Sequence, residues 1–139
     1  MKMAPRVREA DRVELWEAAE VEPLEALAMS VGNSLEAWTG IVDGEIVCMF
    51  GVSAPSMTGD VAFPWLLGTD LIRRHAKVFL GLNRPVVERW QTLFPVLLNY
   101  VHSSNTTAMA WLRWMGFTIF NPEPYGPHGS LFCKFERRA

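Results

Sequence analysis

The residues best placed to do chemistry lie where an apolar run meets the start of a helix. The run 61–67 leads into Gly68–Asp70, and the cationic side chains Arg73 and Arg74 follow one turn later. Backbone N–H groups at a helix start bind anions, and a glycine lets a phosphate approach closely. The carboxylate of Asp70 would repel that phosphate by about 4 kcal/mol at close range. Two interpretations stay open: a plain helix cap, or an altered phosphate site in which the two arginines offset the repulsion.

A second group of candidate residues lies at the start of a later helix. Ser104 or Asn105 is predicted to cap this helix, because either side chain can accept a hydrogen bond from a helix N–H. Ala108 then falls on the inner face of the helix. Gly116 supplies the conformation in which the chain leaves the helix, and Phe117 begins the next strand.

Composition excludes several classes of protein. The chain has 139 residues, 50% of them hydrophobic and 20% charged, which indicates one compact soluble domain, 1–139. A net charge of −2 gives no concentrated basic face for nucleic acid. No apolar run approaches the ~20 residues of a membrane-spanning helix. Cys48 and Cys133 lack CxxC spacing and the histidines lack ligand spacing, so we expect reduced thiols, no metal, and a cytoplasmic location, whether in a cell or in an infected one.

Hydrophobic periodicity and turn residues predict the elements that must position these groups. Asp11, with Glu14 three residues later, forms a capping box at a helix start. Asp43–Gly44 between two apolar runs predicts a β-hairpin. Pro85 is expected to break one helix and start another. The predicted elements are a strand at 7–10, helices at 11–19 and 23–33, strands at 37–42, 45–53 and 61–67, a helix capped by Thr69 or Asp70 that is interrupted at 83–85 and resumes to 94, a strand at 96–101, a helix at 105–115, and strands at 117–120 and 131–135.

Counted with the interrupted helix as one element, the order is β-α-α-β-β-β-α-β-α-β-β. This order predicts an α/β fold with a mixed sheet, of the α+β kind. It also resembles the GNAT (Gcn5-related N-acetyltransferase) superfamily, whose acyl-CoA N-acyltransferase fold has a splayed central pair of strands. The resemblance in element order covers nearly the whole chain. It is specific in residues over Leu97–Phe117, where Asn105, Ala108 and Gly116 stand at the family's spacing.

The resemblance implies a coenzyme pyrophosphate against the start of the main helix, and acetyl-CoA as the cofactor if that donor site is functional. The family pattern Gln/Arg-x-x-Gly-x-Gly/Ala aligns with Trp65–Asp70 and keeps only Gly68. Trp65 replaces the first polar residue, and Asp70 stands where a small residue is expected. On this pattern no cofactor is expected. If a working donor site remains, its expected residues are Leu66, Leu67, Gly68, Thr69, Arg73, Arg74 and Asn105.

The resemblance also implies an acid that protonates the departing thiolate, often a Tyr seven residues beyond the helix Asn. Counting from Asn105 reaches Leu112, which has no hydroxyl. General acid catalysis typically contributes 10²–10⁴-fold, so its loss would weaken an enzyme without proving inactivity. Tyr125 and His128, in the loop that borders the acceptor site in this fold, are conditional substitutes. Glu36, near a central strand, is a conditional general base.

Two short stretches resemble a narrower group within the superfamily. Pro64–Thr69 and Leu98–Thr106 are similar to small GNAT-like proteins encoded among the late, virion-assembly genes of tailed bacteriophages and prophages. That group implies a phage structural or assembly protein as partner. The last helix offers a conditional partner-binding face of Trp111, Arg113 and Trp114, because Trp and Arg are enriched at interface centres.

Two functions follow as expectations. The first is a degenerate, non-catalytic GNAT-like phage or prophage protein that acts through protein–protein contacts in virion morphogenesis, with no nucleic acid or membrane as partner. The second is an acetyl-CoA-dependent N-acetyltransferase with an altered donor site and an unknown amine substrate. Whether the chain is an enzyme, and whether it forms an oligomer, stays open at the level of sequence.

Overall fold

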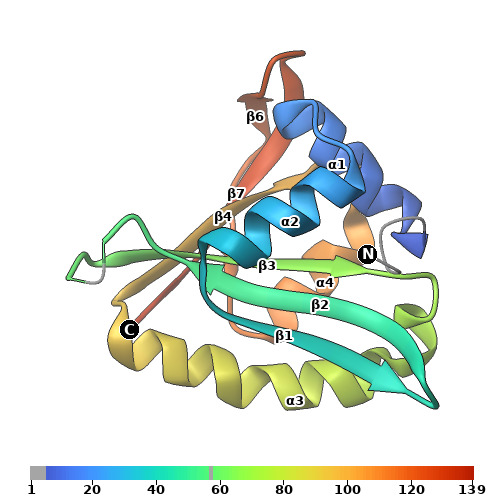
Figure 1. Cartoon of the computed structure of the whole chain (residues 1–139). Helices are drawn as coiled ribbons and strands as arrows, with labels where there is room; N and C mark the ends of the chain where they lie inside the picture. Colours follow the sequence, from blue (N-terminus) through green and yellow to red (C-terminus); the bar gives the residue numbers. More distant parts are fainter. Residues whose placement is uncertain (1–5, 57) are drawn as a thin grey trace.

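The computed structural model describes residues 6–56 and 58–139, and only the backbone at positions 27, 28, 30 and 31. Over these residues the chain forms four helices and one mixed seven-stranded sheet (Figure 1). The elements are α1 (Glu9–Ala19), α2 (Pro23–Asn33), β1 (Ser34–Val42), β2 (Glu45–Ser53), β3 (Val61–Gly68), α3 (Ile72–Leu93), β4 (Val96–His102), α4 (Thr106–Trp114), β5 (Thr118–Ile119), β6 (Glu123–Tyr125) and β7 (Ser130–Arg138).

The strands follow the order β1-β2-β3-β4-β7-β5, with β6 paired to β7. Among the strands that the structure describes, only β3 and β4 run parallel, and their ladder holds just two pairs, Val61 with Val96 and Ala62 with Leu97. Beyond these pairs the two strands separate. The sheet therefore opens at its centre, between the second half of β3 and the second half of β4, which is the splay that the resemblance to the GNAT superfamily implies.

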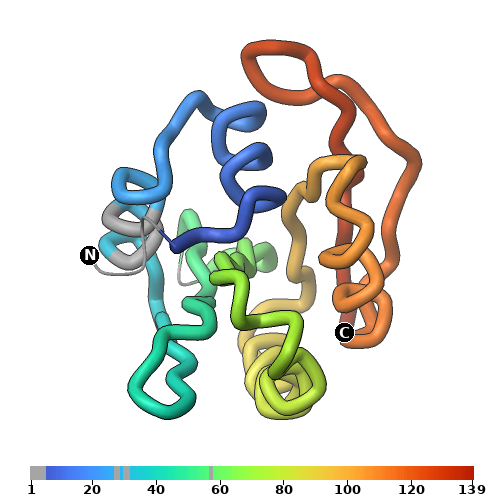
Figure 2. Tube along the Cα trace, turned by 90° about the vertical axis from the view of Figure 1, so that its right-hand side faces the viewer, coloured from blue at the N-terminus to red at the C-terminus, as the bar shows by residue number. Residues whose placement is uncertain are grey.

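Helices cover both faces of the sheet. Alternate side chains of β3 show the two faces, because successive residues of a strand point to opposite sides. Leu66 packs in a cluster with Ile72 and Phe79 of α3, whereas Leu67 packs with Leu15 of α1. The larger core lies on the α3 side, where residues of α3 and α4 enclose the sheet. Figure 2 shows α1 and α2 on the opposite side of the chain from α3.

Local turn signals are confirmed where they act over a few residues. The hairpin β1–β2 turns at Asp43 and Gly44, whose φ angles of 49° and 78° are those that this tight turn requires. Asn105 caps α4 by accepting a hydrogen bond from Ala108 N–H at 3.4 Å. Gly116, with φ of 93°, gives the predicted exit from the helix.

The predicted break at Pro85 is wrong, because α3 runs without interruption through 22 residues. An interior proline removes one helix hydrogen bond and costs about 3 kcal/mol. In α3 the side chains on both sides of Pro85 continue one buried face, so packing outweighs that loss. The buried residues of this face are Ile72, Phe79, Asn83, Val87 and Trp90.

The N-terminal predictions are also corrected. Instead of a strand at 7–10, the described residues contain an isolated bridge between Val7 and Thr69, and α1 already begins at Glu9. The observed order therefore starts with a helix, and β6 adds a short strand that was predicted as loop. The capping box is wrong as well: the N-cap is Arg8, it makes no side-chain cap bond, and Asp11 lies inside the helix.

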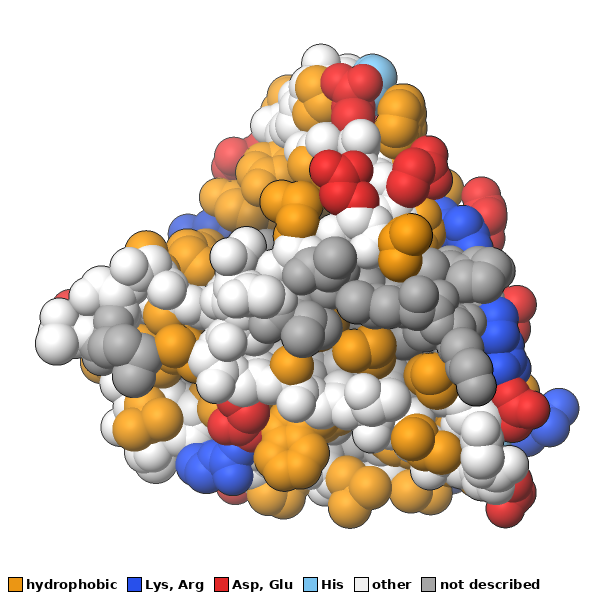
Figure 3. Space-filling view, viewed as in Figure 1, with side chains coloured by type: hydrophobic (Ala, Val, Ile, Leu, Met, Phe, Trp, Pro, Cys, Tyr) orange, Lys and Arg blue, Asp and Glu red, His pale blue; other side chains and the backbone are white. Residues whose placement is uncertain are grey.

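Charge is distributed over the surface. Figure 3 shows acidic side chains mainly toward the top and right of one face and basic ones at its right edge and lower left, with apolar and uncharged side chains between them. No described helix is long and apolar enough to cross a membrane.

Candidate functional site

The backbone amides that lead into α3 already have acceptors within the chain. Gly68 N–H donates to Asp11 Oδ2 at 2.9 Å, and Thr69 N–H donates to the carbonyl oxygen of Val47 at 2.9 Å. Gly68 ends β3 and α3 begins at Ile72, so the carboxylate of Asp11 occupies an amide of the turn before the helix and places a negative charge where a phosphate would approach. An anion could bind these two amides only after it displaced both contacts.

Neither predicted cap of α3 is present. The N-cap is Leu71, without a side-chain cap bond, and α3 begins at Ile72. The Thr69 hydroxyl donates back to the carbonyls of Ile46 and Val47, at 2.9 and 3.1 Å. Asp70 is exposed. Thr69 therefore fastens the end of β3 to β2.

Asp11 reaches the Gly68 amide because the chain before α1 crosses the end of β3. Val7 forms the isolated bridge with Thr69, and Arg8 N–H donates to the carbonyl of Gly68 at 2.7 Å. We call residues 7–14 the N-terminal strap. The strap places the first turns of α1 directly over the amides of Gly68 and Thr69.

Arg8 is the charged centre of the strap. Its guanidinium is paired with Asp11 at 3.0 Å and donates to Asn105 Oδ1 at 3.1 Å. It also lies 5.1 Å from the centre of the Trp111 ring, a cation–π contact. Arg8 is 8% exposed and Asp11 3% exposed. Removing one partner of such a buried ion pair typically destabilises a protein by about 3–5 kcal/mol. The contacts of Arg8 therefore stabilise the position of the strap on the site.

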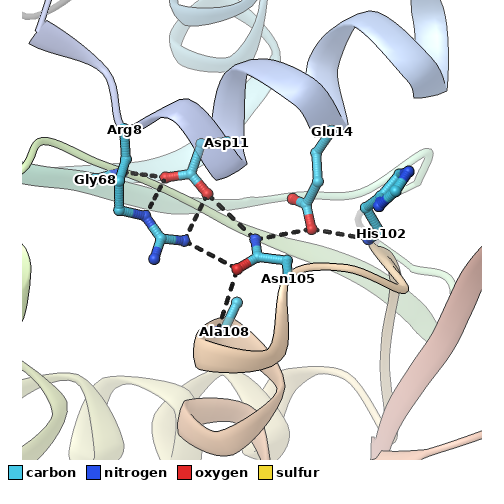
Figure 4. Close-up of polar contacts among 7 residues, drawn as sticks. All are labelled: Arg8, Asp11, Glu14, Gly68, His102, Asn105 and Ala108. Atoms are coloured by element: carbon cyan, nitrogen blue, oxygen red, sulfur yellow. Dashed lines mark hydrogen bonds and ion pairs between the residues drawn. The ribbon is translucent and has the colours of Figure 1, made fainter.

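Asn105 joins the strap to α4 and β4 (Figure 4). Its side-chain N–H donates to Glu14 Oε1 at 3.0 Å, and Glu14 Oε1 also accepts His102 N–H at 2.8 Å. Asn105 is only 2% exposed. With Arg8 and Ala108 donating to its oxygen, the hydrogen-bonding capacity of the Asn105 side chain is used within the protein.

The carboxyl group of Glu14 has an altered acidity. Burial, with a smaller contribution from the charge of Asp11, raises the pKa of Glu14 from 4.5 to about 7. Hydrogen bonds from Asn105 and His102 and the charge of Arg8 act in the opposite direction. Glu14 therefore changes its protonation state near neutral pH, beside the opening between β3 and β4.

The opening is bridged below the strap by a side chain. Asn99 Nδ2 of β4 donates to the Pro64 carbonyl of β3 at 3.0 Å. Next to this bridge lies a cavity of about 250 Å³, with Glu14 and Tyr100 in its wall. The remaining wall is mostly apolar, from α1, β3 and Phe132. The cavity is large enough for a small molecule or a side chain, and Glu14 places a carboxyl group in its wall.

The structure brings some of the other predicted donor-site residues to the cavity and leaves others exposed on α3. Leu66 and Leu67 line the cavity, as β3 residues next to Gly68. Arg73 and Arg74 are exposed on the first turn of α3. The strap brings Asp11 to the Gly68 N–H, and the guanidinium of Arg8 is paired with the same carboxylate.

Tyr125 and His128 lie on the β6–β7 hairpin, which packs against α1. Tyr125 stacks on Tyr100 with ring centres 4.4 Å apart, and burial raises its pKa. His128 stacks on Trp16 and lies 3.9 Å from the carboxylate of Glu20. Tyr125 is thus adjacent to a wall residue of the cavity, whereas His128 is engaged at the far end of α1.

Glu36 is not brought to the site. It lies on β1, at the edge of the sheet, where it pairs with Arg89 of α3 and accepts the indole N–H of Trp38. Leu112, at the position where the family's acid is expected, is an apolar wall residue below Asn105. Among the described residues, no three His, Cys, Asp or Glu side chains are grouped to hold a metal ion.

The conditional partner face is split in two. Trp111 faces inward under Arg8, whereas Arg113 is exposed and Trp114 is 49% exposed. Arg84 of α3 lies 5.1 Å from the centre of the Trp114 ring. The exposed part of this face is therefore Arg84, Arg113 and Trp114, from the middle of α3 and the end of α4.

The sequence prediction missed the strap as part of the site. Arg8, Asp11 and Glu14 recur every three residues, which places them on one face of a helix. Charged residues on one face of a helix usually face solvent, but here the apolar residues Leu15 and Ala18 follow on the same face. Charged residues on the face that carries the apolar contacts are the signal that could have identified buried partners.

Comparison with known proteins supports the fold. No protein-family model and no curated protein matches the sequence. A ribosomal-protein-alanine N-acetyltransferase from Brucella melitensis superposes with a TM-score of 0.68 at 13% identity, over 94% of this chain and 89% of the other. A GCN5-related N-acetyltransferase from Kribbella flavida gives 0.66 at 16% identity, over 99% and 93%. A GNAT superfamily phosphinothricin acetyltransferase from Sinorhizobium meliloti, solved with acetyl-CoA, gives 0.66 at 18% identity, over 94% and 80%.

These matches define the class of the fold. The protein has the GNAT fold over nearly its whole length, as the order of its elements predicts. At such low identity the likeness extends to the fold alone, and the chemistry of this chain is argued from its own residues.

Proposed function

We propose that this chain is a GNAT-fold protein without acetyltransferase activity, which acts through protein–protein contacts in the assembly of a tailed-phage or prophage particle. The observation that carries the proposal is the pairing of Gly68 N–H with Asp11 and of Thr69 N–H with Val47. Two amides of the turn that would hold a coenzyme pyrophosphate, those of Gly68 and Thr69, have intramolecular partners. One of these partners is negatively charged.

Two further features support the absence of transfer. Asn105, which corresponds to the family's helix Asn, is bonded to Arg8, Glu14 and Ala108. Leu112 offers no proton to a departing thiolate. Each loss alone would weaken an enzyme, and together they remove the phosphate contact and the general acid.

The particle-assembly role is supported by where the resembling stretches lie. Pro64–Thr69 and Leu98–Thr106 contain most of the groups that close the site outside the strap. Asn99 bonds Pro64 between the stretches, and Gly68 and Asn105 both bond the strap. The stretches that resemble phage GNAT-like proteins therefore contain residues whose hydrogen bonds bridge β3 and β4 and fasten the strap to the site. For the partner contact we propose the exposed face of Arg84, Arg113 and Trp114.

Acetyl-CoA binding tests the catalytic part of this proposal. A ligand at 100 times its dissociation constant stabilises the folded state by about 2.7 kcal/mol. We expect no increase in thermal stability and no heat of binding with millimolar acetyl-CoA. A clear shift that Gly68→Glu abolishes would contradict the proposal, since it would place the pyrophosphate at the start of α3.

Presence in particles tests the assembly part. Mass spectrometry of purified particles, or of assembly intermediates, from a host that carries the gene should detect the chain. Its absence from both, with normal particle yield after deletion of the gene, would contradict the assembly role and leave the result on acetyl-CoA unaffected.

The second candidate is an N-acetyltransferase with an altered donor site, and one observation favours it. A general base is most effective when its pKa lies near the working pH, and Glu14, with a pKa of about 7, borders the cavity of about 250 Å³. On this alternative the strap would have to leave the amides when acetyl-CoA binds. Acetyl transfer to an amine that is lost in Glu14→Gln would favour this candidate.

A further inference from the structure

The sheet ends at β1, whose outer edge has no partner strand. Among the strands that the structure describes, β1 pairs with β2 alone (Figure 1). The ladder between them is regular over Glu36–Gly40, between two register shifts. Natural edge strands are commonly protected from pairing with other chains by Lys, Pro or a bulge, and Glu36–Gly40 contains none of these. This segment is therefore available for pairing with another strand.

Exposed apolar side chains lie beside this edge. A groove of about 270 Å³ lies between β1 and α3, with Trp38 and Leu82 in its walls. The exposed fractions are 47% for Trp38, 60% for Val78 and 61% for Leu82. Figure 3 shows apolar side chains along the lower margin of the molecule, where Figure 1 places β1 and α3. An apolar patch next to an unpaired strand indicates a protein–protein contact.

The charged residues beside the groove are paired within the chain. Glu36 of β1 and Arg89 of α3 form an ion pair, and the groove itself is lined by apolar and uncharged side chains. A two-fold axis places a surface against its own copy, so an unpaired charge near the axis would face the same charge. A second copy of this chain can therefore cover the groove without repulsion between like charges.

We propose that β1 pairs with β1 of a second copy, antiparallel and about a two-fold axis at Trp38. Trp38 is the middle residue of the regular segment. With the axis there, Trp38 lies against its own copy, Ala37 against Thr39, and Glu36 against Gly40. Each carboxylate then faces a glycine instead of another carboxylate, so the segment is complementary to itself.

The same axis brings the apolar flanks of the two α3 helices together. Gly40 leaves no room for a side chain against Phe79 of α3, so the face of β1 that carries Gly40 and Trp38 is the face toward α3. The two copies of α3 then lie on the same side of the joined sheet. Trp38, Val78 and Leu82 of both copies lose their exposure to water in one contact.

The expected dimer is reversible and independent of the proposed function. One short strand and one helix flank supply fewer residues than the roughly 20–30 per partner of a standard interface, so we expect a dissociation constant in the micromolar range. Arg84 lies over Trp114 of α4, away from the groove between β1 and α3. A monomeric variant should therefore still make the proposed contact with a phage protein.

Opposite charges at the axis test the proposal. Sedimentation velocity of the wild-type chain at micromolar concentrations should show a monomer–dimer equilibrium. Trp38→Lys and Trp38→Glu should each weaken the dimer at least about tenfold, because like charges then meet at the axis. An equimolar mixture of the two variants should restore dimers, because Lys then faces Glu.

Trp38→Cys gives an independent readout. Opposite residues of an antiparallel pair have Cα atoms about 4.5–5.5 Å apart, within the range of a disulfide. Mild oxidation should therefore give a covalent dimer of this variant. The wild-type chain should give none, because Cys48 and Cys133 are buried.

Leu131→Lys is the matched control, since Leu131 is 49% exposed and lies on β7, away from β1. It should leave the equilibrium unchanged. A wild-type chain that stays monomeric overturns the proposal and would mean that a different protein covers the groove. The proposal is equally overturned if Trp38→Lys and Trp38→Glu dimerise as the wild type does, if their mixture stays monomeric, or if Trp38→Cys forms no covalent dimer.

Discussion

Asp11 accepts a hydrogen bond from the backbone N–H of Gly68 at 2.9 Å, across 57 residues of sequence. The bond gives the last amide of β3, in the turn that leads into the main helix, an acidic partner from the chain itself. In a turn that binds a phosphate such an amide is open to the ligand. The hydrogen bond between Asp11 and Gly68 therefore shows that the fold is kept while one amide of the expected phosphate site is already occupied.

Asp11→Ala should destabilise the protein by about 3 kcal/mol, because it leaves Arg8 buried without its ion pair and Gly68 N–H without an acceptor. Urea denaturation measures the loss. Glu9→Ala is the matched control on the same helix, where the side chain is exposed and a change within about 0.5 kcal/mol is expected. Equal effects of the two substitutions would mean that Asp11 does not hold the strap.

Glu14→Gln should remove a pH dependence of stability. The pKa of Glu14 is raised from 4.5 to about 7, so folding favours the protonated form. The contribution to stability is complete below about 4.5 and is lost as the pH rises through about 7. Glutamine keeps an accepting oxygen without ionising, so at about pH 8 the variant should be more stable than the wild type by about 3 kcal/mol.

Urea denaturation of both proteins across this pH range measures the difference. Near pH ~4 the two proteins should be equally stable, because Glu14 is then protonated in the folded and the unfolded state. A difference that is constant with pH would show that Glu14 does not titrate in the opening between β3 and β4.

Pro85→Ala should stabilise the protein by about 1 kcal/mol, because α3 is continuous and alanine restores a helix N–H at an exposed position. Gly81→Ala, also exposed and with open space for a methyl group, should give a similar gain. Thermal unfolding measures both. A loss of stability in Pro85→Ala, with a gain in Gly81→Ala, would indicate that the helix breaks at the proline.

Trp114→Ala should weaken recovery of the chain with phage particles or assembly intermediates at least tenfold while changing its stability little, since the ring is half exposed. Quantitative mass spectrometry of the particle fraction measures recovery. Trp38→Ala, at a similarly exposed ring on β1, is the control and should leave recovery unchanged. Equal loss in the two variants, or no loss in either, would argue against the face of Arg84, Arg113 and Trp114.

Local rules explain what could be predicted from the sequence. The turn at Asp43–Gly44, the cap at Asn105 and the exit at Gly116 depend on residues a few positions apart, and all three are confirmed. The order of elements gave the GNAT fold in the same way, because each strand and helix carries its own periodicity.

Long-range contacts explain what could not. Asp11 and Glu14 have the spacing of a capping box, but their carboxylates accept N–H groups of Gly68 and His102, which no local pattern places nearby. Pro85 predicts a helix break on local grounds, but the packing of α3 on the sheet outweighs this local preference and the helix continues. The closure of the site therefore becomes visible only in three dimensions.

The hydrogen exchange rates of the Gly68 and Thr69 amides test the central claim most directly. If Asp11 and Val47 occupy these amides, both should exchange about 10³-fold or more slowly than in an unstructured chain. Millimolar coenzyme A should leave both rates unchanged. Fast exchange in the free protein, followed by protection when coenzyme A is added, would contradict the account, because it would mean that these amides are available to a phosphate.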